Sequence, residues 1–383
     1  MVTTISPELL RQRLRNEPDT QLLDVRPAED YDSWHVPGSV NIPFALGDTL
    51  DMDRFVEETE FDLDDELVVI CAEGKSSRAI ADALEDHGAE NVAVVQDGMI
   101  GWSQLYELTA IPTVAPALEI FQVQRVAKGC LGYVIGDPHT GRVAVVDPTR
   151  HLDEFRRVAG DNDMEITRVI DTHIHADHIS GGRRLADDVD AAYHLPVGAA
   201  DRDITLAFDP LEPNEVLSVG DIEIKAIHTP GHTAEAMSLL VGTDAILTGD
   251  TLLTNGVGRT ELQFDGDSAA TGAEALYESV HRSILTLPDG LTVLPGHFSA
   301  EEEREFRTVG EPIRTTVRAL RTEVPILQAS KSDFVERLST DPPRKPPNYD
   351  RVIRINTGRE MPADEEDAAN LELGPNRCAA AAD

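Results

Sequence analysis

Short apolar runs, bounded by glycine, proline and polar residues, recur along the chain and predict buried strands. In its first part these runs are Leu22–Val25, Leu67–Ile70 and Val92–Val95. Residues 77–87 have helical spacing instead, with Ile80 and Leu84 on one face. Strands that alternate with helices predict a parallel sheet. The pattern therefore predicts an α/β domain at the beginning of the chain.

A second group of apolar runs predicts the strands of another domain. They are Leu118–Val123, Gly132–Gly136, Val143–Asp147 and Ile166–Asp171. Pro112 and Pro116 separate the two groups and predict a linker. We expect a first domain over 1–106, a linker over 107–117, a second domain over 118–358 and an acidic, alanine-rich, mobile tail over 359–383. A helical pattern over residues 301–324 is expected to cover one sheet face.

The composition is that of a globular protein, with 383 residues and 41% hydrophobic content. We find no apolar run of about 18 residues and no basic-then-apolar leader, so neither a membrane span nor a secretion signal is predicted. Three scattered cysteines, Cys71, Cys130 and Cys378, do not make a disulfide framework. Cys130 is interpreted as a small packing residue, and the role of Cys378 stays open. The expected location is the cytoplasm.

The net charge of -37, from 70 acidic and 33 basic residues, disfavours the binding of polyanions to this protein. Such a surface repels nucleic acid and anionic membranes. The acidic residues are spread over the whole chain. At molar salt, where the Debye length is about 3 Å, their mutual repulsion is screened. We therefore predict a halophilic protein.

Residues 172–178, Thr-His-Ile-His-Ala-Asp-His, are the strongest chemical signal. Three imidazoles and a carboxylate lie directly after a predicted strand, and they are the ligand types that bind zinc, iron or manganese. Further candidates follow apolar runs and a glycine: His232, Asp250 and His297. Four such strand-end sites predict a metal centre.

This order of motifs (HxHxDH, Gly-His, Gly-Asp, Pro-Gly-His) resembles the metallo-β-lactamase superfamily over roughly residues 118–325. The resemblance implies an αββα sandwich with the metal at one edge. Within the superfamily, residues 176–182 and 258–263 resemble the persulfide dioxygenases. Glyoxalase II, a thioesterase, is the near neighbour.

The spacing alone allows two metal arrangements. A dinuclear zinc hydrolase would use His173, His175 and His232 on one ion, Asp177, His178 and His297 on the other, and Asp250 as the bridge. A mononuclear oxygenase would bind one Fe(II) through His173, His232 and Asp250. The persulfide dioxygenase resemblance implies the second arrangement, with His175, Asp177, His178 and His297 as surrounding groups that orient the ligands. It also implies substrate contacts for Arg259 and, more weakly, Gln263.

The first domain resembles rhodanese, a sulfurtransferase, through residues 23–29, 35–43, 71–77 and 97–102. Cys71 follows a predicted strand, and its loop leads into a helix whose positive end favours a thiolate. The loop residues are Gly74, Lys75, Ser76 and Ser77. The resemblance implies that Cys71 takes up a persulfide sulfur. Rhodanese loops often carry Arg where this chain has Ser76, which puts thiosulfate as the donor in doubt.

The apolar pattern predicts an α/β protein, and the two resemblances imply an enzyme of sulfide oxidation. The expected function is an Fe(II) persulfide dioxygenase, with one iron per chain, coupled to rhodanese sulfur transfer. Its expected partners are a small thiol persulfide, O2, and sulfite or thiosulfate, with a homodimer as the quaternary state to test. The alternative is a dinuclear zinc thioesterase with a rhodanese-like accessory module.

Overall fold

The computed structural model describes residues 2–17, 19–264, 266–298, 310–340, 345–346 and 348–374. Within this part, the chain forms two compact units, residues 1–105 with 373–374 and residues 106–372. Each unit has its own sheet structure and its own core. No helix in the described residues is both long and apolar enough to cross a membrane.

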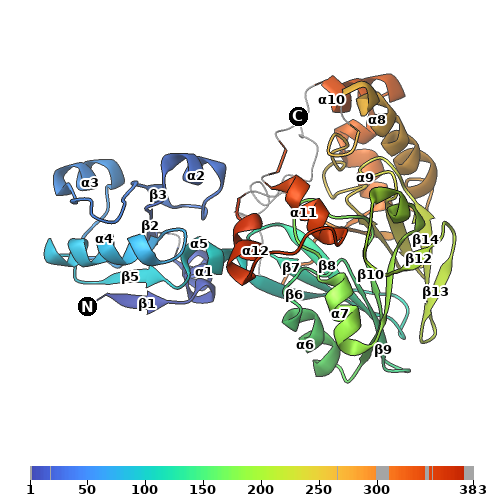
Figure 1. The fold of residues 1–383 in the computed structure, drawn as a ribbon, viewed down its shortest axis with the longest axis horizontal. Helices are drawn as coiled ribbons and strands as arrows, with labels where there is room; N and C mark the ends of the chain where they lie inside the picture. Colours follow the sequence, from blue (N-terminus) through green and yellow to red (C-terminus); the bar gives the residue numbers. More distant parts are fainter. Residues whose placement is uncertain are drawn as a thin grey trace. The chain divides into compact units, whose positions relative to one another are not determined.

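The first unit is built on a parallel sheet (Figure 1). In the described residues its order is β1-β5-β4-β2-β3, with β1 (Thr3–Ile5), β2 (Gln21–Asp24), β3 (Val40–Asn41), β4 (Leu67–Ile70) and β5 (Val92–Val95). Its helices are α1 (Pro7–Asn16), α2 (Ala28–Ser33), α3 (Met52–Thr59), α4 (Lys75–Asp86) and α5 (Gly98–Ser103). Every residue of β4 and β5 is buried, which explains their unbroken apolar sequences. The structure confirms the expected strands and the helix after Cys71.

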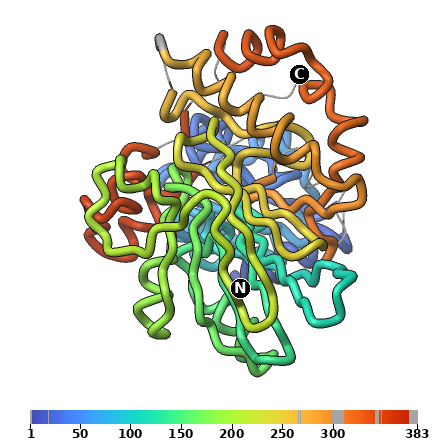
Figure 2. Tube along the Cα trace, turned by 90° about the vertical axis from the view of Figure 1, so that its right-hand side faces the viewer, coloured from blue at the N-terminus to red at the C-terminus, as the bar shows by residue number. Residues whose placement is uncertain are grey.

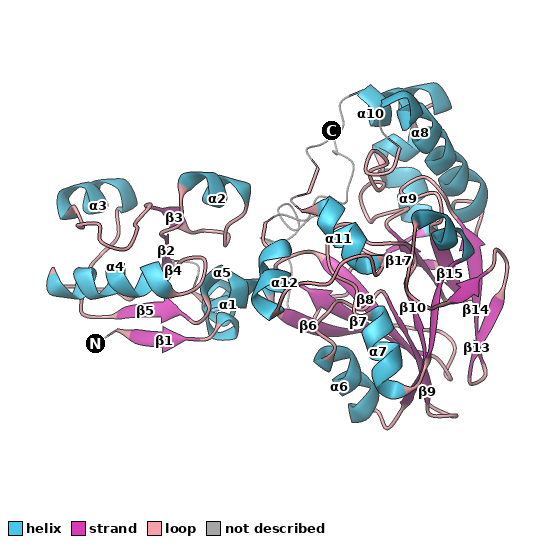
Figure 3. Cartoon of the chain, viewed as in Figure 1, coloured by secondary structure: helices cyan, strands magenta, loops and turns pink. Residues whose placement is uncertain are grey.

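The second unit contains two sheets in the described part of the chain (Figure 3). The first has the order β12-β11-β10-β9-β8-β7-β6, with β6 (Tyr106–Ile111), β7 (Glu119–Arg125), β8 (Cys130–Asp137), β9 (Arg142–Val146), β10 (Glu165–Ile170), β11 (Ala192–Pro196) and β12 (Asp209–Leu211). The second has the order β13-β14-β15-β16-β17-β18, with β13 (Val216–Val219), β14 (Ile222–His228), β15 (Met237–Val241), β16 (Ala245–Gly249), β17 (Thr292–Pro295) and β18 (Thr315–Thr316).

Helices cover the outer faces of both sheets. The helices of this unit are α6 (Asp153–Asp161), α7 (Gly182–Val189), α8 (Ala269–Glu278), α9 (Val317–Glu323), α10 (Lys331–Thr340), α11 (Tyr349–Asn356) and α12 (Glu365–Leu371), of which α11 and α12 pack against the loop after β10. One apolar cluster joins inward residues of the two sheets, such as Ile135 and Leu239. A second packs α6 and α7 on the first sheet, and a third packs α8, α9 and α10 on the second sheet. Figures 1 and 2 show the chain passing from the green strands through the yellow strands to the orange helices. The second unit is therefore the expected αββα sandwich.

Three expectations about the chain's organisation need correction. Residues 106–111, placed partly in the linker, form β6 and pair with β7 from Tyr106 to Ile111, because none of them is a proline and each can take part in the strand ladder. Residues 365–371, placed in the mobile tail, form α12, whose apolar side chains are buried. The helix expected over 301–324 is limited to α9 among the described residues, since 310–314 are not helical and 299–309 lie outside them.

Candidate metal centre and sulfur-binding loop

The loops that follow four strands of the second unit meet at one edge of the two sheets. His173 comes after β10, His232 after β14, Asp250 after β16 and His297 after β17. Backbone hydrogen bonds join the two sheets here, because Met237 N–H donates to Thr172 O at 2.9 Å and Leu131 N–H donates to Gly296 O at 2.8 Å. The loops are therefore held together by the sandwich itself.

His173, His232 and Asp250 form one buried group, called here the first metal group. Asp250 Oδ2 lies 3.9 Å from His173 Nε2 and 3.7 Å from His232 Nε2. These distances exceed a hydrogen bond but leave room for one ion between the three atoms, because metal–ligand bonds are about 2.1 Å long. The structure thus brings together the three residues expected to hold a single metal ion.

Neighbouring groups fix the orientation of each ligand in the first metal group. His232 Nδ1 donates to Arg259 O at 2.6 Å, which leaves Nε2 with its lone pair toward Asp250. His173 Nδ1 lies 3.0 Å from Thr172 Oγ1. His297 Nδ1 lies 2.5 Å from Asp250 Oδ1, so Oδ2 is the carboxylate oxygen left for a metal.

The donor set fits a cation. Within the described residues, the buried atoms His173 Nε2 and Asp250 Oδ2 have no hydrogen-bond partner. Burying such atoms without a partner costs free energy that a bound cation offsets. Burial, together with the nearby His175 and His232, lowers the pKa of His173 well below its ordinary value, which keeps the ring neutral as a ligand must be. Although burial opposes it, His297 lowers the pKa of Asp250, so the carboxylate is ionised.

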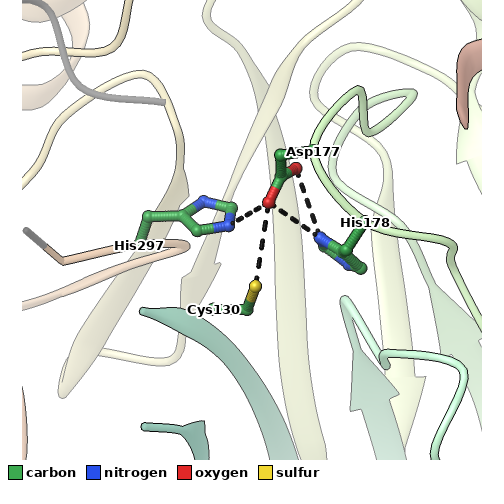
Figure 4. A group of neighbouring side chains, drawn as sticks. All are labelled: Cys130, Asp177, His178 and His297. Carbon is green, nitrogen blue, oxygen red and sulfur yellow. Dashed lines mark hydrogen bonds and ion pairs between the residues drawn. The ribbon is translucent and has the colours of Figure 1, made fainter. Parts of the chain in front are cut away.

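A second buried group, called here the cysteine group, comprises Cys130, Asp177, His178 and His297 (Figure 4). Its centre is Asp177 Oδ2, which lies 2.8 Å from His297 Nε2, 3.2 Å from His178 Nδ1 and 3.7 Å from Cys130 Sγ. Burial raises the pKa of Asp177, but the histidine charges outweigh burial and lower it well below the ordinary value. For Cys130, burial likewise raises the pKa, and His178 and His297 bring it down to about 6. Cys130 is therefore part of the polar site rather than the simple packing residue expected.

A third group, Asp147, Asp171 and His175, supports the histidine loop from behind. Asp147 Oδ1 lies 3.2 Å from His175 Nε2 and accepts from Thr172 N–H at 2.7 Å. Asp147 has a positive φ of 49°, a left-handed conformation that aspartate tolerates at turns. His175 Nδ1 has no hydrogen-bond partner in the described residues, which leaves it available to a ligand.

Residues near the C-terminus clamp the same loop. Asn356 Nδ2 donates to His175 O at 2.9 Å and to His178 O at 2.8 Å, and Asn356 Oδ1 accepts from Ser180 N–H at 2.9 Å. Glu372 Oε1 accepts from Ile179 N–H at 2.8 Å. No sequence motif predicted that these residues belong to the site, because the loop that they contact lies more than 170 residues earlier in the chain.

Cys71 follows β4 in the first unit and is 4% exposed. Gly74 N–H donates to Cys71 Sγ at 3.0 Å, and Sγ lies 3.4 Å from Ser77 Oγ. Gly98 closes the other side, where an added Cβ would lie 2.2 Å from Cys71 O. The side chain of Lys75 is 74% exposed and pairs with Glu73 at 2.7 Å. The loop therefore presents the backbone N–H of Gly74 and the hydroxyl of Ser77 to the sulfur, directly at the amino end of α4.

Comparison with known proteins agrees with this geometry. The family model for the metallo-beta-lactamase superfamily matches residues 126–297, and the model for the rhodanese-like domain matches residues 6–105. A hydroxyacylglutathione hydrolase from Polaromonas is 31% identical over 211 residues, 52% of this chain and 74% of that protein. The chain belongs to the metallo-beta-lactamase superfamily.

Two further relatives of this metallo-beta-lactamase chain carry another name. The mitochondrial persulfide dioxygenase ETHE1 from Bos taurus is 29% identical over 231 residues, 58% of this chain and 82% of that protein. The crystal structure of ETHE1 from Myxococcus xanthus superimposes with a TM-score of 0.54 at 27% identity, covering 63% of this chain and 98% of that one. Both named activities therefore occur among relatives at similar identity.

Arg259 and Gln263 of the metallo-beta-lactamase domain both contact the loop that carries His232. The Arg259 side chain is 0% exposed and forms a buried ion pair with Glu261, while its carbonyl orients His232. Gln263 Oε1 accepts from Ala234 N–H at 2.8 Å and from Arg202 at 3.1 Å. Both residues support the His232 loop in this structure, and their contact with a substrate stays a prediction. Cys378 lies outside the described residues.

Proposed function

We propose that this chain oxidises a small thiol persulfide with O2 and transfers sulfane sulfur through Cys71. The observation that carries the proposal is the first metal group, in which two imidazoles and one carboxylate face a common centre. Two histidines and one carboxylate are the ligand set of non-heme Fe(II) oxygenases. The ETHE1 relatives, one of them named a persulfide dioxygenase, and the rhodanese-like domain support the same assignment.

At the first metal group, Fe(II) would leave coordination positions open for the persulfide sulfur and O2. The chain's own residues prepare that centre. The Arg259 carbonyl aims His232, and His297 holds Asp250 so that one carboxylate oxygen remains for the metal. His173, His232 and Asp250 are each at most 2% exposed, so bulk water has little access to the three ligands. The overall reaction consumes one persulfide, one O2 and one water, and it yields the free thiol, sulfite and protons.

At the rhodanese-like domain, the Cys71 thiolate would attack the outer sulfur of a donor. The sulfur–sulfur bond of the donor breaks, its thiolate leaves, and Cys71 becomes a persulfide. Sulfite then takes the outer sulfur, which gives thiosulfate and returns the Cys71 thiolate. Gly74 N–H, which already donates to Sγ, stabilises the negative sulfur in both steps.

An oxygen electrode and metal analysis test the proposal. The purified chain should contain about one iron, as a two-histidine, one-carboxylate site implies, and it should consume O2 when glutathione persulfide is added. Asp250→Ala should remove the iron and the O2 uptake. The matched control is Asp137→Ala, which removes another buried carboxylate whose partners are turn residues such as Thr140. Two zinc ions per chain, with no O2 uptake, would contradict the proposal.

The second candidate is a dinuclear zinc thioesterase, favoured by the contact between the two metal groups. His297 touches Asp250 through Nδ1 and Asp177 through Nε2, so two ions would share one ligand framework. The Polaromonas relative is named a hydrolase of hydroxyacylglutathione. Thioester cleavage by the zinc-loaded chain, in the same preparation that fails to consume O2, would select this candidate.

A further inference from the structure

Arg202 lies at the sheet edge that also carries the first metal group. Strands β10 and β11 are neighbours and run parallel, so the segments after their carboxyl ends leave the sheet on the same side. The loop after β10 carries His173, and the short helix after β11, η1 (Val197–Arg202), ends at Arg202. The topology therefore brings an arginine to the metal edge, although no sequence motif marks it.

Contacts with the metal loops fix the guanidinium of Arg202. Its Nη1 donates to Glu235 Oε1 and Oε2, both at 2.9 Å, and to Gln263 Oε1 at 3.1 Å. Glu235 lies three residues after His232, and its Oε1 also accepts from Ile174 N–H at 3.3 Å in the histidine loop after β10. The position of the guanidinium is therefore tied to both loops that carry histidine ligands of the first metal group.

These contacts leave two nitrogens of the Arg202 guanidinium without a partner. Within the described residues, Nε and Nη2 make no hydrogen bond. Their N–H bonds point in the same direction from one edge of the planar group, and this fork matches the two oxygens of a carboxylate. The Arg202 side chain is 16% exposed, whereas that of Arg259 is 0% exposed. Arg202 therefore offers a ligand an oriented pair of donors.

We propose that Arg202 binds a carboxylate of the thiol substrate through Nε and Nη2, and so selects carboxylate-bearing thiols such as glutathione. The inference rests on the proposed function, because the persulfide must bind at the first metal group. The net charge of -37 disfavours anions around the whole chain, so an anionic substrate needs a local cation. Glu235 holds the guanidinium in place before the substrate arrives, which reduces the conformational entropy lost on binding.

The test compares two persulfides that differ in their carboxylates, glutathione persulfide and the persulfide of glutathione diethyl ester. Arg202→Gln should lower kcat/KM for O2 uptake about 10- to 100-fold with the first substrate, because a hydrogen-bonded charge pair is lost, and should change it little with the diester. The matched control is Arg183→Gln, which removes an arginine of α7 that pairs with Asp187 and should leave both values unchanged. Equal losses with both substrates would overturn the proposal, since Arg202 would then only support Glu235.

Two further variants separate recognition from folding. The double variant Arg202→Gln, Glu235→Gln leaves no buried carboxylate unpaired, and it should show the same loss of selectivity as Arg202→Gln. Arg202→Lys keeps the charge but lacks the fork, so it should recover only part of the selectivity, and full recovery would contradict the forked contact. Circular dichroism checks that each variant is folded.

Binding of S-methylglutathione provides a readout that does not depend on O2 uptake. This ligand keeps both carboxylates and has no sulfur–sulfur bond to react. Isothermal titration calorimetry should show that its affinity falls about 10- to 100-fold in Arg202→Gln and stays unchanged in Arg183→Gln. The same affinity in Arg202→Gln and the parent chain would overturn the role of Arg202, whatever the reaction at the metal. Failure of the dioxygenase assignment alone would leave this difference in affinity in place.

Discussion

The residues around Cys71 lie close together in the sequence, whereas those of the first metal group lie far apart. The groups around Cys71 Sγ, Gly74 N–H and Ser77 Oγ, lie within six residues of it. The first metal group joins His173 to Asp250, and its supporting loop is held by Asn356. A short segment can therefore form the Cys71 site, while the first metal group depends on the complete sandwich. Substitutions should therefore affect one site without affecting the other.

The largest difference between the two sites should appear when one essential residue is replaced in each, and sulfur transfer and O2 uptake are both measured. Cys71→Ser should abolish sulfur transfer to sulfite, because a serine hydroxyl cannot form a persulfide, and it should leave O2 uptake with glutathione persulfide intact. His232→Ala should do the reverse, since it removes a metal ligand from the other unit. Both activities are measured on the same preparations. Loss of O2 uptake in Cys71→Ser with normal iron content would mean that Cys71 delivers sulfur to the metal centre.

Loss of the hydrogen bonds from Asn356 should affect the first metal group and leave the Cys71 site unchanged. Asn356→Asp keeps the size of the side chain but cannot donate to the carbonyls of His175 and His178. We expect the metal affinity to fall about 10- to 100-fold, as for other groups that orient metal ligands. Competition with a chelator measures this change. The matched control is Asn348→Asp at the start of the same helix, where the amide donates to Leu371 O instead.

If Asn356→Asp and Asn348→Asp release the metal equally, the effect is a general loss of stability and the clamp has no specific role. Sulfur transfer at Cys71 provides a second control, because that loop lies in the other unit. It should stay unchanged in both variants.

Residues in local sequence motifs could be predicted, whereas residues that meet only in the folded sandwich could not. His173, His232 and Asp250 were predicted because each follows a buried strand in a recognisable motif, and strand ends meet at one edge of a sheet. Cys130 was misjudged, because a lone cysteine in an apolar run is usually inert, and its partners lie in loops after β10 and β17.

The C-terminal segment was misjudged for a related reason. Its acidic composition is typical of a tail, yet Asp364 caps α12 and Arg351 forms ion pairs with Asp367. Glu372, buried against Arg125 and Arg150, could be found only from long-range contacts. Composition describes a segment in isolation, and the two arginine partners of Glu372 lie more than 200 residues earlier in the chain.

A moderate effect on stability is expected at Glu372, in the second unit alone. Burial raises the pKa of this carboxyl, but Arg125 and Arg150 outweigh burial and lower it to about 2, from an ordinary value of 4.5. The charged form therefore stabilises the fold above about pH 4.5, and this contribution disappears as the pH falls toward 2. It amounts to something on the order of 3 kcal/mol.

Urea unfolding of Glu372→Gln against the parent chain measures this contribution. The difference in unfolding free energy should be large at neutral pH and should shrink as the pH falls below the ordinary carboxyl value. Glu365→Gln is the control, because Glu365 contacts the same Arg150 but its side chain is 74% exposed. A difference that does not change with pH would show that the loss comes from packing.

The smallest difference between the two units should appear in how their melting temperatures depend on salt concentration. Residues 1–105 carry 23 acidic and 7 basic side chains, a net charge of -16, while residues 106–383 carry 47 and 26, a net charge of -21. The first region thus has about twice the net charge per residue. Because screening weakens as KCl is lowered from molar to about a tenth of that, repulsion should destabilise both units and the first one more. Differential scanning calorimetry of the full chain, with Cys71 alkylation reporting on the first unit, should show its melting temperature falling further than that of the second. Equal shifts would remove charge density as the cause, and unchanged melting temperatures in both units would contradict the prediction of a halophilic protein.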